Sequence, residues 1–334
     1  MFNLMKRRLV GLEIDSGELR AVELSGKANF PTLESWGREV LPDGAVEDGI
    51  VYSSQQVGEA LQELWSRHNF KGSEVILGIS NQEVLVRFAN FPKVPEDKLG
   101  GLIRHQAGEY LPIPLPSVIL DHTIIGETTG EEGDMYEVIL VAAKQEMLYG
   151  FLQTLSLAGL NAWDIDVSSL VLLKVLPGLP REGSVVVVDI ANGQTNILLV
   201  EGKVPRLARR IPVRLKDVAN ILGASESELP SLGDLSQSPP ENFLQWVDTL
   251  VGEIRSSISY YQSQEGAQPV EEILLSGKGA RIPKLLERTE ETLNLPVKKM
   301  RPGEGINNFQ LPGGQELELD YTIALSLALR GLEG

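Results

Sequence analysis

Residues 9–25, LVGLEIDSGELRAVELS, and residues 185–203, VVVVDIANGQTNILLVEGK, are two versions of one pattern. Each has an apolar run, an acid near its end (Glu13 or Asp189), a turn of small and polar residues, and a second run in which apolar residues alternate. Two apolar runs separated by Gly, Asn, Asp or Ser predict a β-hairpin. Two such hairpins about half a chain apart predict two similar halves that face each other across a cleft.

Composition narrows the function classes. With 334 residues, 42% of them hydrophobic, the chain is long enough for two domains that each have a core. A net charge of −16 argues against nucleic acid or an anionic membrane as the main partner, because their phosphates would be repelled. There is no cysteine and only three scattered histidines, so we expect neither disulfides nor a zinc site.

The sequence also predicts where the chain works. No apolar stretch approaches the ~20 residues that a membrane-spanning helix needs. The basic residues at 6–8 are followed by Glu13 and Asp15 instead of the apolar core of a signal peptide. We therefore expect a cytoplasmic protein without direct membrane insertion.

Strands and helices alternate along the rest of the chain, which predicts an α/β fold. Periodicity and punctuation predict further strands at 32–40, 75–79, 84–88, 118–125, 136–143, 161–167, 205–213 and 272–275. They predict helices at 55–68, 95–110, 144–158, 168–176, 242–262, 282–293 and 321–332.

These elements suggest two domains. The first is expected at 1–176 and contains a small β-α-β-β insert at about 84–143, with a hairpin turn at 128–134. The second is expected at 181–334, after a linker at 177–180. Its outer part, about 214–240, is short and acidic, and its C-terminal helix at 320–332 is expected to return to the domain junction.

Three turns are candidates for a binding site: 15–17, 191–193 and 276–280. Backbone N–H groups in such turns can hold phosphate oxygens, and a nearby carboxylate can hold Mg²⁺ through water. A glycine turn before a helix lets a flat ring approach the backbone. Together the turns resemble the nucleotide cleft of the actin and sugar-kinase superfamily. The nucleotide-site candidates are Glu13, Asp15, Ser16, Gly17, Asp189, Asn192, Gly193, Thr195, Gly277, Lys278 and Gly279, with Glu13 and Asp189 as possible Mg²⁺ partners. Equally, Glu13 and Asp189 could simply cap backbone N–H groups.

A closer resemblance covers nearly the whole chain. GLEIDSGELRAVEL at 11–24 and RHQAGEYLPIPLPSVILDH at 104–122 resemble patterns of PilM, the actin-like family of type IV pilus assembly. The remaining matches are DVSSLVLLKVL at 166–176, LARRIPV at 207–213, IRSSISYYQSQ at 254–264, ILLSGKGARIPKL at 273–285 and YTIALSLALRGL at 321–332. The segment at 104–122 separates PilM from FtsA and from the sugar kinases.

The resemblance implies a two-domain actin-like (ribonuclease H-like) fold and an adaptor function. PilM-like proteins bind ATP with Mg²⁺ between their halves and dock the N-terminal peptide of the inner-membrane protein PilN beside the insert. They connect it to the pilus motor and platform proteins, so the chain would be peripheral to the inner face of the membrane. The candidates for the peptide groove are Leu102, Ile103, Gln106 and Tyr110. Alternatively, these residues are the insert's own core.

The pattern departs from the family at the nucleotide turns. Asp15 stands where the family has glycine, and a charge there would repel a phosphate about 4 Å away by roughly 1–4 kcal/mol. Ala191 also replaces a glycine, Lys278 enters the adenosine turn, and no Gly-Gly pair follows Val213. ATP and Mg²⁺ binding therefore stay open. We nominate no catalytic residue, and any ATPase activity is expected to be weak.

Two other functions are alternatives to the adaptor. One is an actin-like ATP-binding protein or ATPase, whose marker would be intact glycines in both phosphate turns. The other is an FtsA-like cell-division protein, which would carry an amphipathic membrane helix beyond a linker. The sequence favours the adaptor over both.

Overall fold

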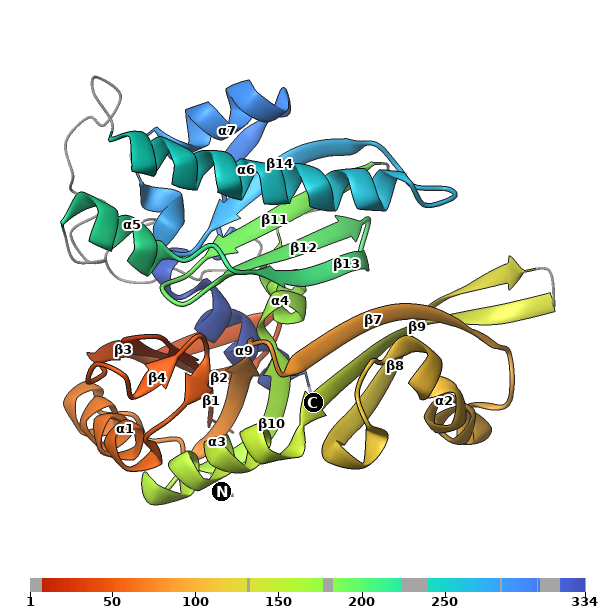
Figure 1. Cartoon of the computed structure of the whole chain (residues 1–334). Coiled ribbons are helices and arrows are strands. Elements are labelled where there is room, and N and C mark those ends of the chain that lie inside the picture. The colour runs from red at the N-terminus through yellow and green to blue at the C-terminus, as the bar shows by residue number, and fades with distance from the viewer. Residues whose placement is uncertain are drawn as a thin grey trace.

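The computed structural model describes residues 8–130, 133–176, 183–223, 240–282, 284–304, 306 and 319–333. It contains two five-stranded sheets, one above the other in Figure 1, and a three-stranded insert at their side. The expected linker at 177–180 and nearly all of the acidic segment at 224–240 lie outside the described residues. Of the described helices, none is both long and apolar enough to cross a membrane.

The first sheet has the strand order β10-β6-β1-β2-β3. β1, β2 and β3 form an antiparallel meander, whereas β6 pairs parallel with β1 and β10 parallel with β6. The elements are β1 (Arg8–Asp15), β2 (Glu18–Lys27), β3 (Phe30–Val40), the short ribbon β4 (Val46–Glu47) and β5 (Ile50–Val51), α1 (Ser54–His68), β6 (Glu74–Ile79), α3 (Gln145–Leu157) and β10 (Asn161–Val167).

The second sheet repeats this topology, with the order β13-β12-β11-β14-β15. Again three strands form an antiparallel meander, and two more continue the sheet in parallel. The elements are β11 (Ser184–Ile190), β12 (Thr195–Glu201), β13 (Val204–Ile211), α5 (Leu215–Leu222), α6 (Glu241–Gln262), β14 (Val270–Ser276), the 3₁₀ turn η4 (Lys278–Arg281), α7 (Leu285–Leu293) and β15 (Val297–Lys299). The duplicated hairpin pattern thus marks two copies of one sheet.

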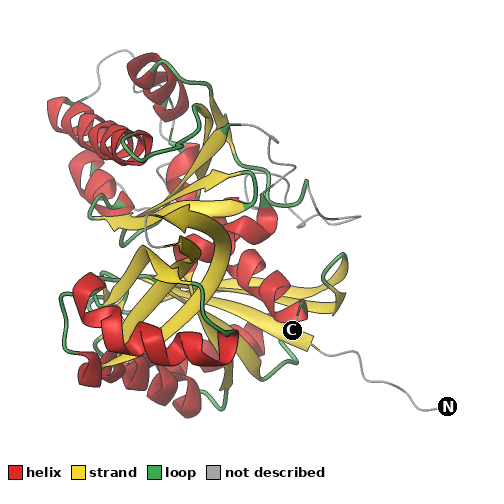
Figure 2. Ribbon diagram, turned by 90° about the vertical axis from the view of Figure 1, so that its right-hand side faces the viewer, coloured by secondary structure: helices red, strands yellow, loops and turns green. Residues whose placement is uncertain are grey.

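The helix α9 (Thr322–Leu332) lies between the two sheets (Figures 1 and 2). Because side chains alternate across a strand, β1 serves two cores. Val10 and Leu12 pack in the core under α1 and α3, whereas Leu9 packs with α9 in a core that continues into the second sheet. The same alternation places Glu13 and Asp15 on the side of β1 that faces the second half.

The insert projects from the side of the first sheet (Figure 1). It consists of β7 (Val84–Pro92), α2 (Glu96–Tyr110), the 3₁₀ turn η1 (Leu115–Ser117), β8 (Val118–Gly130) and β9 (Gly133–Lys144). Its sheet has the order β7-β9-β8, and α2 packs on it around Phe91, Leu99 and Ile103. The insert therefore has a core of its own.

Several element boundaries differ from the sequence prediction. The hairpin turn expected at 128–134 is shorter, because Thr129 pairs with Asp134 and both strands continue. The helix expected at 168–176 is the short α4 (Ser168–Val171) followed by the 3₁₀ turn η2 (Leu172–Val175), and the helix expected from 282 begins only at Leu285. α5 and β15 were not predicted, since eight and three residues are too few to show a clear period.

Candidate functional site

The turns of the two repeated hairpins meet at the centre of the molecule. The β1–β2 turn has two residues, Ser16 and Gly17, and the β11–β12 turn spans 191–194. The Asp15 carboxylate accepts hydrogen bonds from the backbone N–H groups of Asn192 (2.9 Å) and Gly193 (3.0 Å). In return, the Asn192 side-chain amide donates to the Ser16 carbonyl at 3.2 Å. The predicted phosphate turns are thus bonded directly to each other.

This approach depends on Gly193. A Cβ atom there would lie 2.4 Å from Ser16 Oγ, so Ser16 would have to shift, and 3.1 Å from Asp15 Oδ1, which is a tight contact. The missing side chain at Gly193 thus favours the close approach of the two turns. Ala191, by contrast, is not among the residues of positive φ, so the alanine in place of the family's glycine fits its turn without strain.

Arg20 organises the acids of the first hairpin. Its side chain is 2% exposed and forms a two-point ion pair with Glu13, through Nε (2.9 Å) and Nη2 (2.8 Å). It also donates to Asp15 (2.9 Å) and to Glu18 (2.7 Å). Burial raises the pKa of Glu13 even though the Arg20 charge opposes that shift. Both Glu13 oxygens are thus engaged by Arg20.

Lys278 extends this network to the second half. It is buried in the third turn, and its Nζ lies 2.5 Å from Glu18 Oε2. Burial alone would raise the pKa of Glu18, but the charges of Arg20 and Lys278 outweigh it, so this pKa lies below its ordinary value. Lys278 therefore lies in the expected adenosine turn, and its ammonium group is bound by a carboxylate of the first half.

Asp189 lies on the central strand of the second sheet and is 2% exposed. Burial, together with the neighbouring charge of Glu13, raises its pKa to about 7. A carboxyl with this pKa is only partly ionised near neutral pH. Among the described residues, no group of three His, Cys, Asp or Glu side chains is placed to hold a metal ion.

The remaining site candidates shape the turns. Gly277 has φ +75°, and a Cβ there would lie 2.5 Å from the Ile190 carbonyl oxygen, so this glycine lets the third turn pack on the end of β11. Gly279 packs on the Ile190 side chain, Thr195 Oγ1 donates to the Val213 carbonyl at 2.7 Å, and the Gly17 carbonyl accepts from Leu41 N at 2.9 Å. All eleven candidates therefore lie in or beside the three turns.

The cavity among the acids and cations of these turns is small. It is bounded by Glu13, Arg20, Asp189 and Lys278 and has a volume of about 10 Å³. One water molecule fills such a volume, whereas ligand pockets typically measure about 300–1,000 Å³. Beside the β11–β12 turn, two ion pairs also join the halves: Arg214 with Asp48 (3.1 Å) and Lys216 with Glu47 (2.8 Å).

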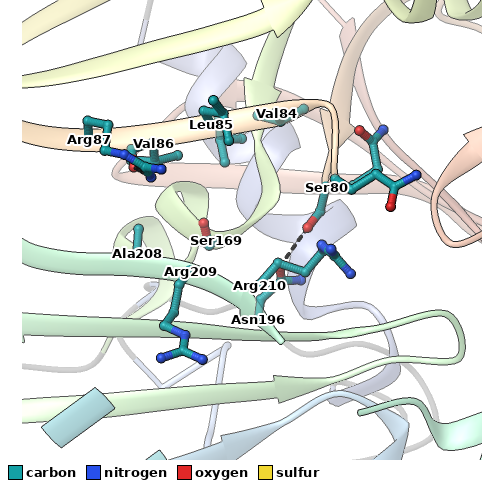
Figure 3. A pocket seen from close by; sticks show the side chains of 13 residues that line it. Ser80, Val84, Leu85, Val86, Arg87, Ser169, Asn196, Ala208, Arg209 and Arg210 are labelled. Atoms are coloured by element: carbon teal, nitrogen blue, oxygen red, sulfur yellow. Dashed lines mark hydrogen bonds between the residues drawn. The ribbon is translucent and has the colours of Figure 1, made fainter. Parts of the chain in front are cut away.

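A larger cavity of about 220 Å³ lies between the insert and the second half (Figure 3). Ser80 donates to Asn196 across it at 2.6 Å, and three arginines, Arg87, Arg209 and Arg210, line it. Arg209 points away from β7 in Figure 3 and pairs with Glu253. Burial lowers the pKa of Arg210, and the charge of Asp48 opposes that shift. Sequence reasoning did not single out these arginines.

The peptide-groove candidates lie apart from the cleft, on α2. Ile103 is 1% exposed in the insert's core, and Leu102 and Tyr110 pack at the edge of that core. The Tyr110 ring lies 5.3 Å from the ring of Phe91. Gln106 is half-buried on the same helix. Of the four, Ile103 is fully buried, whereas Leu102, Gln106 and Tyr110 are half-buried.

Comparison with known families matches residues 11–207, more than half of the chain, to the type IV pilus assembly protein PilM. The chain belongs to the PilM family. The match begins at the first hairpin and ends in β13, so it includes the first half, the insert and both phosphate turns. The resemblance noted in the sequence is therefore confirmed.

Solved structures show the fold. The chain is similar to PilM in a PilM–PilN type IV pilus biogenesis complex, with a TM-score of 0.83 and 24% identity over 98% of this chain and 99% of that one. It is also similar to the ethanolamine utilization protein EutJ of Carboxydothermus hydrogenoformans, with a TM-score of 0.53 and 12% identity over 98% and 90% of the two chains. The expected actin-like fold is confirmed.

The cleft residues do not fit the nucleotide that this fold can hold. Asp15 fills the backbone donors that a phosphate would need, Arg20 engages both oxygens of Glu13, and the cavity beside Glu13 and Asp189 measures about 10 Å³. Sequence reasoning missed Arg20 and Glu18, although a signal existed. A two-residue turn at Ser16-Gly17 places residue 13 opposite 20 and residue 15 opposite 18. Counting that register would have identified the Glu13–Arg20 pair.

Proposed function

We propose that this chain is an adaptor of type IV pilus assembly. It binds the cytoplasmic N-terminal peptide of a PilN-type inner-membrane protein and connects it to the pilus motor and platform. In this function the chain works in the cytoplasm, at the inner face of the membrane, and is held there by its partners. The family match over residues 11–207 carries the proposal, and it is supported by the likeness to a PilM that has been seen with PilN.

The docking site that we propose lies between the insert and the first half. β10 is an edge strand of the first sheet, and an extended peptide can pair with such an edge. Trp163, which is 51% exposed, is the extra residue of a bulge, because pairing with β6 passes from Ala162 to Asp164. Bulges at sheet edges re-aim side chains, here a large aromatic one that can anchor a peptide.

Two further exposed apolar residues belong to neighbouring elements. The Gln145 side chain at the start of α3 donates to the carbonyls of Pro116 (3.2 Å) and Val118 (3.3 Å) at the start of β8. Tyr149 is one helical turn further along the face of α3 that carries Gln145, and Ile119 follows Val118. Tyr149 and Ile119 are both exposed. We propose that they belong to the same docking surface as Trp163.

The candidate residues on α2 form an alternative binding site for the same peptide. Ile103 is buried in the insert's core, so contact there would come from the half-buried Leu102, Gln106 and Tyr110. Mutations distinguish the site at β10 from the site on α2.

The test is fluorescence polarisation with a labelled peptide of the cytoplasmic N-terminal segment of a PilN-type protein from the same organism. Trp163→Ala and Tyr149→Ala are each expected to weaken binding by about tenfold, which corresponds to about 1.4 kcal/mol. Tyr260→Ala, an equally drastic change at a 62% exposed tyrosine on α6, is the matched control and should not change binding.

The results of this experiment test the location of the binding site separately from the adaptor function. Loss of binding in Gln106→Ala with full binding in Trp163→Ala would place the peptide on α2. No binding by the wild-type chain at high micromolar peptide would contradict the adaptor function itself.

A further inference from the structure

Asp15 has the bonding pattern of a bound anion. Its carboxylate accepts four hydrogen bonds, from Ser16 N (2.8 Å), Asn192 N (2.9 Å), Gly193 N (3.0 Å) and Arg20 Nη2 (2.9 Å). A carboxylate has about four acceptor positions, so Asp15 is saturated. Two of the donors come from a turn more than 170 residues away in the chain.

Successive backbone N–H groups in a turn form a concave site for anions. In the second hairpin this anion site faces Asp15. The two turns are so close that a side chain at position 193 would collide with Ser16. The anion at this site is therefore part of the protein.

We propose that Asp15 is a built-in substitute for a nucleotide phosphate, which fastens the two halves together and makes this chain a nucleotide-independent member of its fold. The clamp consists of Asp15 in the turn of the second hairpin, Arg20 beneath it, and the Lys278–Glu18 pair beside it.

Charge supports this inference. The three carboxylates Glu13, Asp15 and Glu18 are held by two buried cations, Arg20 and Lys278, and Glu18 also lies 3.9 Å from the exposed Arg38. A triphosphate would add negative charge where the buried cations are already paired with carboxylates. It would also have to displace Asp15 from both backbone donors and make room where the cavity measures about 10 Å³.

The test is thermal unfolding of the full chain and of Asp15→Gly, with and without millimolar MgATP or acetate. Acetate carries the carboxylate that Asp15→Gly removes. The wild-type melting temperature is expected to respond to neither ligand. That of Asp15→Gly should be several degrees lower and should rise in a saturable way with acetate, as ligand binding to the native state requires.

Two variants control this experiment. Asp15→Asn should also melt several degrees lower but should not respond to acetate, because its own amide occupies the site. Asp43→Gly removes an exposed aspartate and should melt like the wild type, with or without acetate, at matched ionic strength. If Asp15→Gly does not fold in plain buffer, refolding yield against acetate concentration gives the same measurement.

A saturable MgATP-induced rise in the wild-type melting temperature would overturn the proposal. So would variants Asp15→Gly and Asp15→Asn that melt like the wild type. The proposal goes beyond the adaptor function and is separable from it, because peptide binding is measured independently. We expect the peptide affinity of the wild type to be the same with and without MgATP.

Discussion

The two hairpins share one topology and have opposite chemistry at their turns. The β1–β2 hairpin presents carboxylates, held by Arg20, whereas the β11–β12 hairpin presents the backbone N–H groups of Asn192 and Gly193. One copy is the acceptor and the other the donor. Two turns that could together surround a phosphate instead bind each other. A repeated fold can thus keep its architecture while the ligand between the copies is replaced by a side chain.

The largest effect is expected in the β1–β2 hairpin, which holds the acceptor carboxylates, from the variant Arg20→Met. This change would leave Glu13, Asp15 and Glu18 facing Lys278 as the remaining cation of the clamp. Removing one partner of a buried ion pair typically lowers the free energy of unfolding by about 3–5 kcal/mol. Urea denaturation at neutral pH measures this loss.

Arg67→Met is the matched control. Arg67 also pairs with two glutamates, Glu39 and Glu63, but its side chain is 59% exposed. A surface pair contributes about 0–1 kcal/mol, so the control should unfold nearly like the wild type. Equal losses in both variants would mean that the first hairpin is not organised by Arg20.

The β11–β12 hairpin can be tested through the pH dependence of stability, because it contains Asp189. Its pKa of about 7, against an ordinary value of 3.8, means that the folded protein holds the proton more tightly than the unfolded chain. The stability that this proton lends is complete below about pH 4 and is lost as the pH rises through about 7. Asp189→Asn does not ionise, so relative to the wild type it should gain stability from about pH 5 to about pH 8, by at most about 3 kcal/mol.

Thermal unfolding across this pH range measures the gain. Asp217→Asn, at a partly exposed ion pair, serves as the control and should show no such trend. A relative stability of Asp189→Asn that does not change with pH would mean that Asp189 is ionised throughout, as a metal-bound carboxylate would be.

The sequence predicted the two hairpins well, because their signals are local. Apolar runs and turn residues within about 20 positions define each strand pair, and the three turns could be grouped by their resemblance to a nucleotide cleft. What could not be predicted was the distance between the turns. Whether Asp15 faces a phosphate or the N–H of Asn192 depends on contacts between residues 177 positions apart, which no local period encodes.

The insert shows the same limit. The apolar stripe of α2 predicted a helix, and Leu102, Ile103 and Tyr110 do share a face. Whether that face binds a peptide or packs on its own sheet depends on β7 and β9, and the structure places Ile103 against Phe91 in the core. The exposed Trp163 was not noticed, because a one-residue bulge in β10 does not disturb the strand pattern.

The variant Gly193→Ala tests how close the two turns are, and we expect it to have the smallest effect. The new methyl group would lie 2.4 Å from Ser16 Oγ and would push the turns apart, so we expect a loss of about 1–3 kcal/mol in the free energy of unfolding. Gly252→Ala is the control, because this glycine lies within α6 with open space around it. There an alanine should stabilise the helix by up to about 1 kcal/mol. Opposite signs in the two glycine variants would support direct contact between the turns, and a neutral Gly193→Ala would show that they are separated.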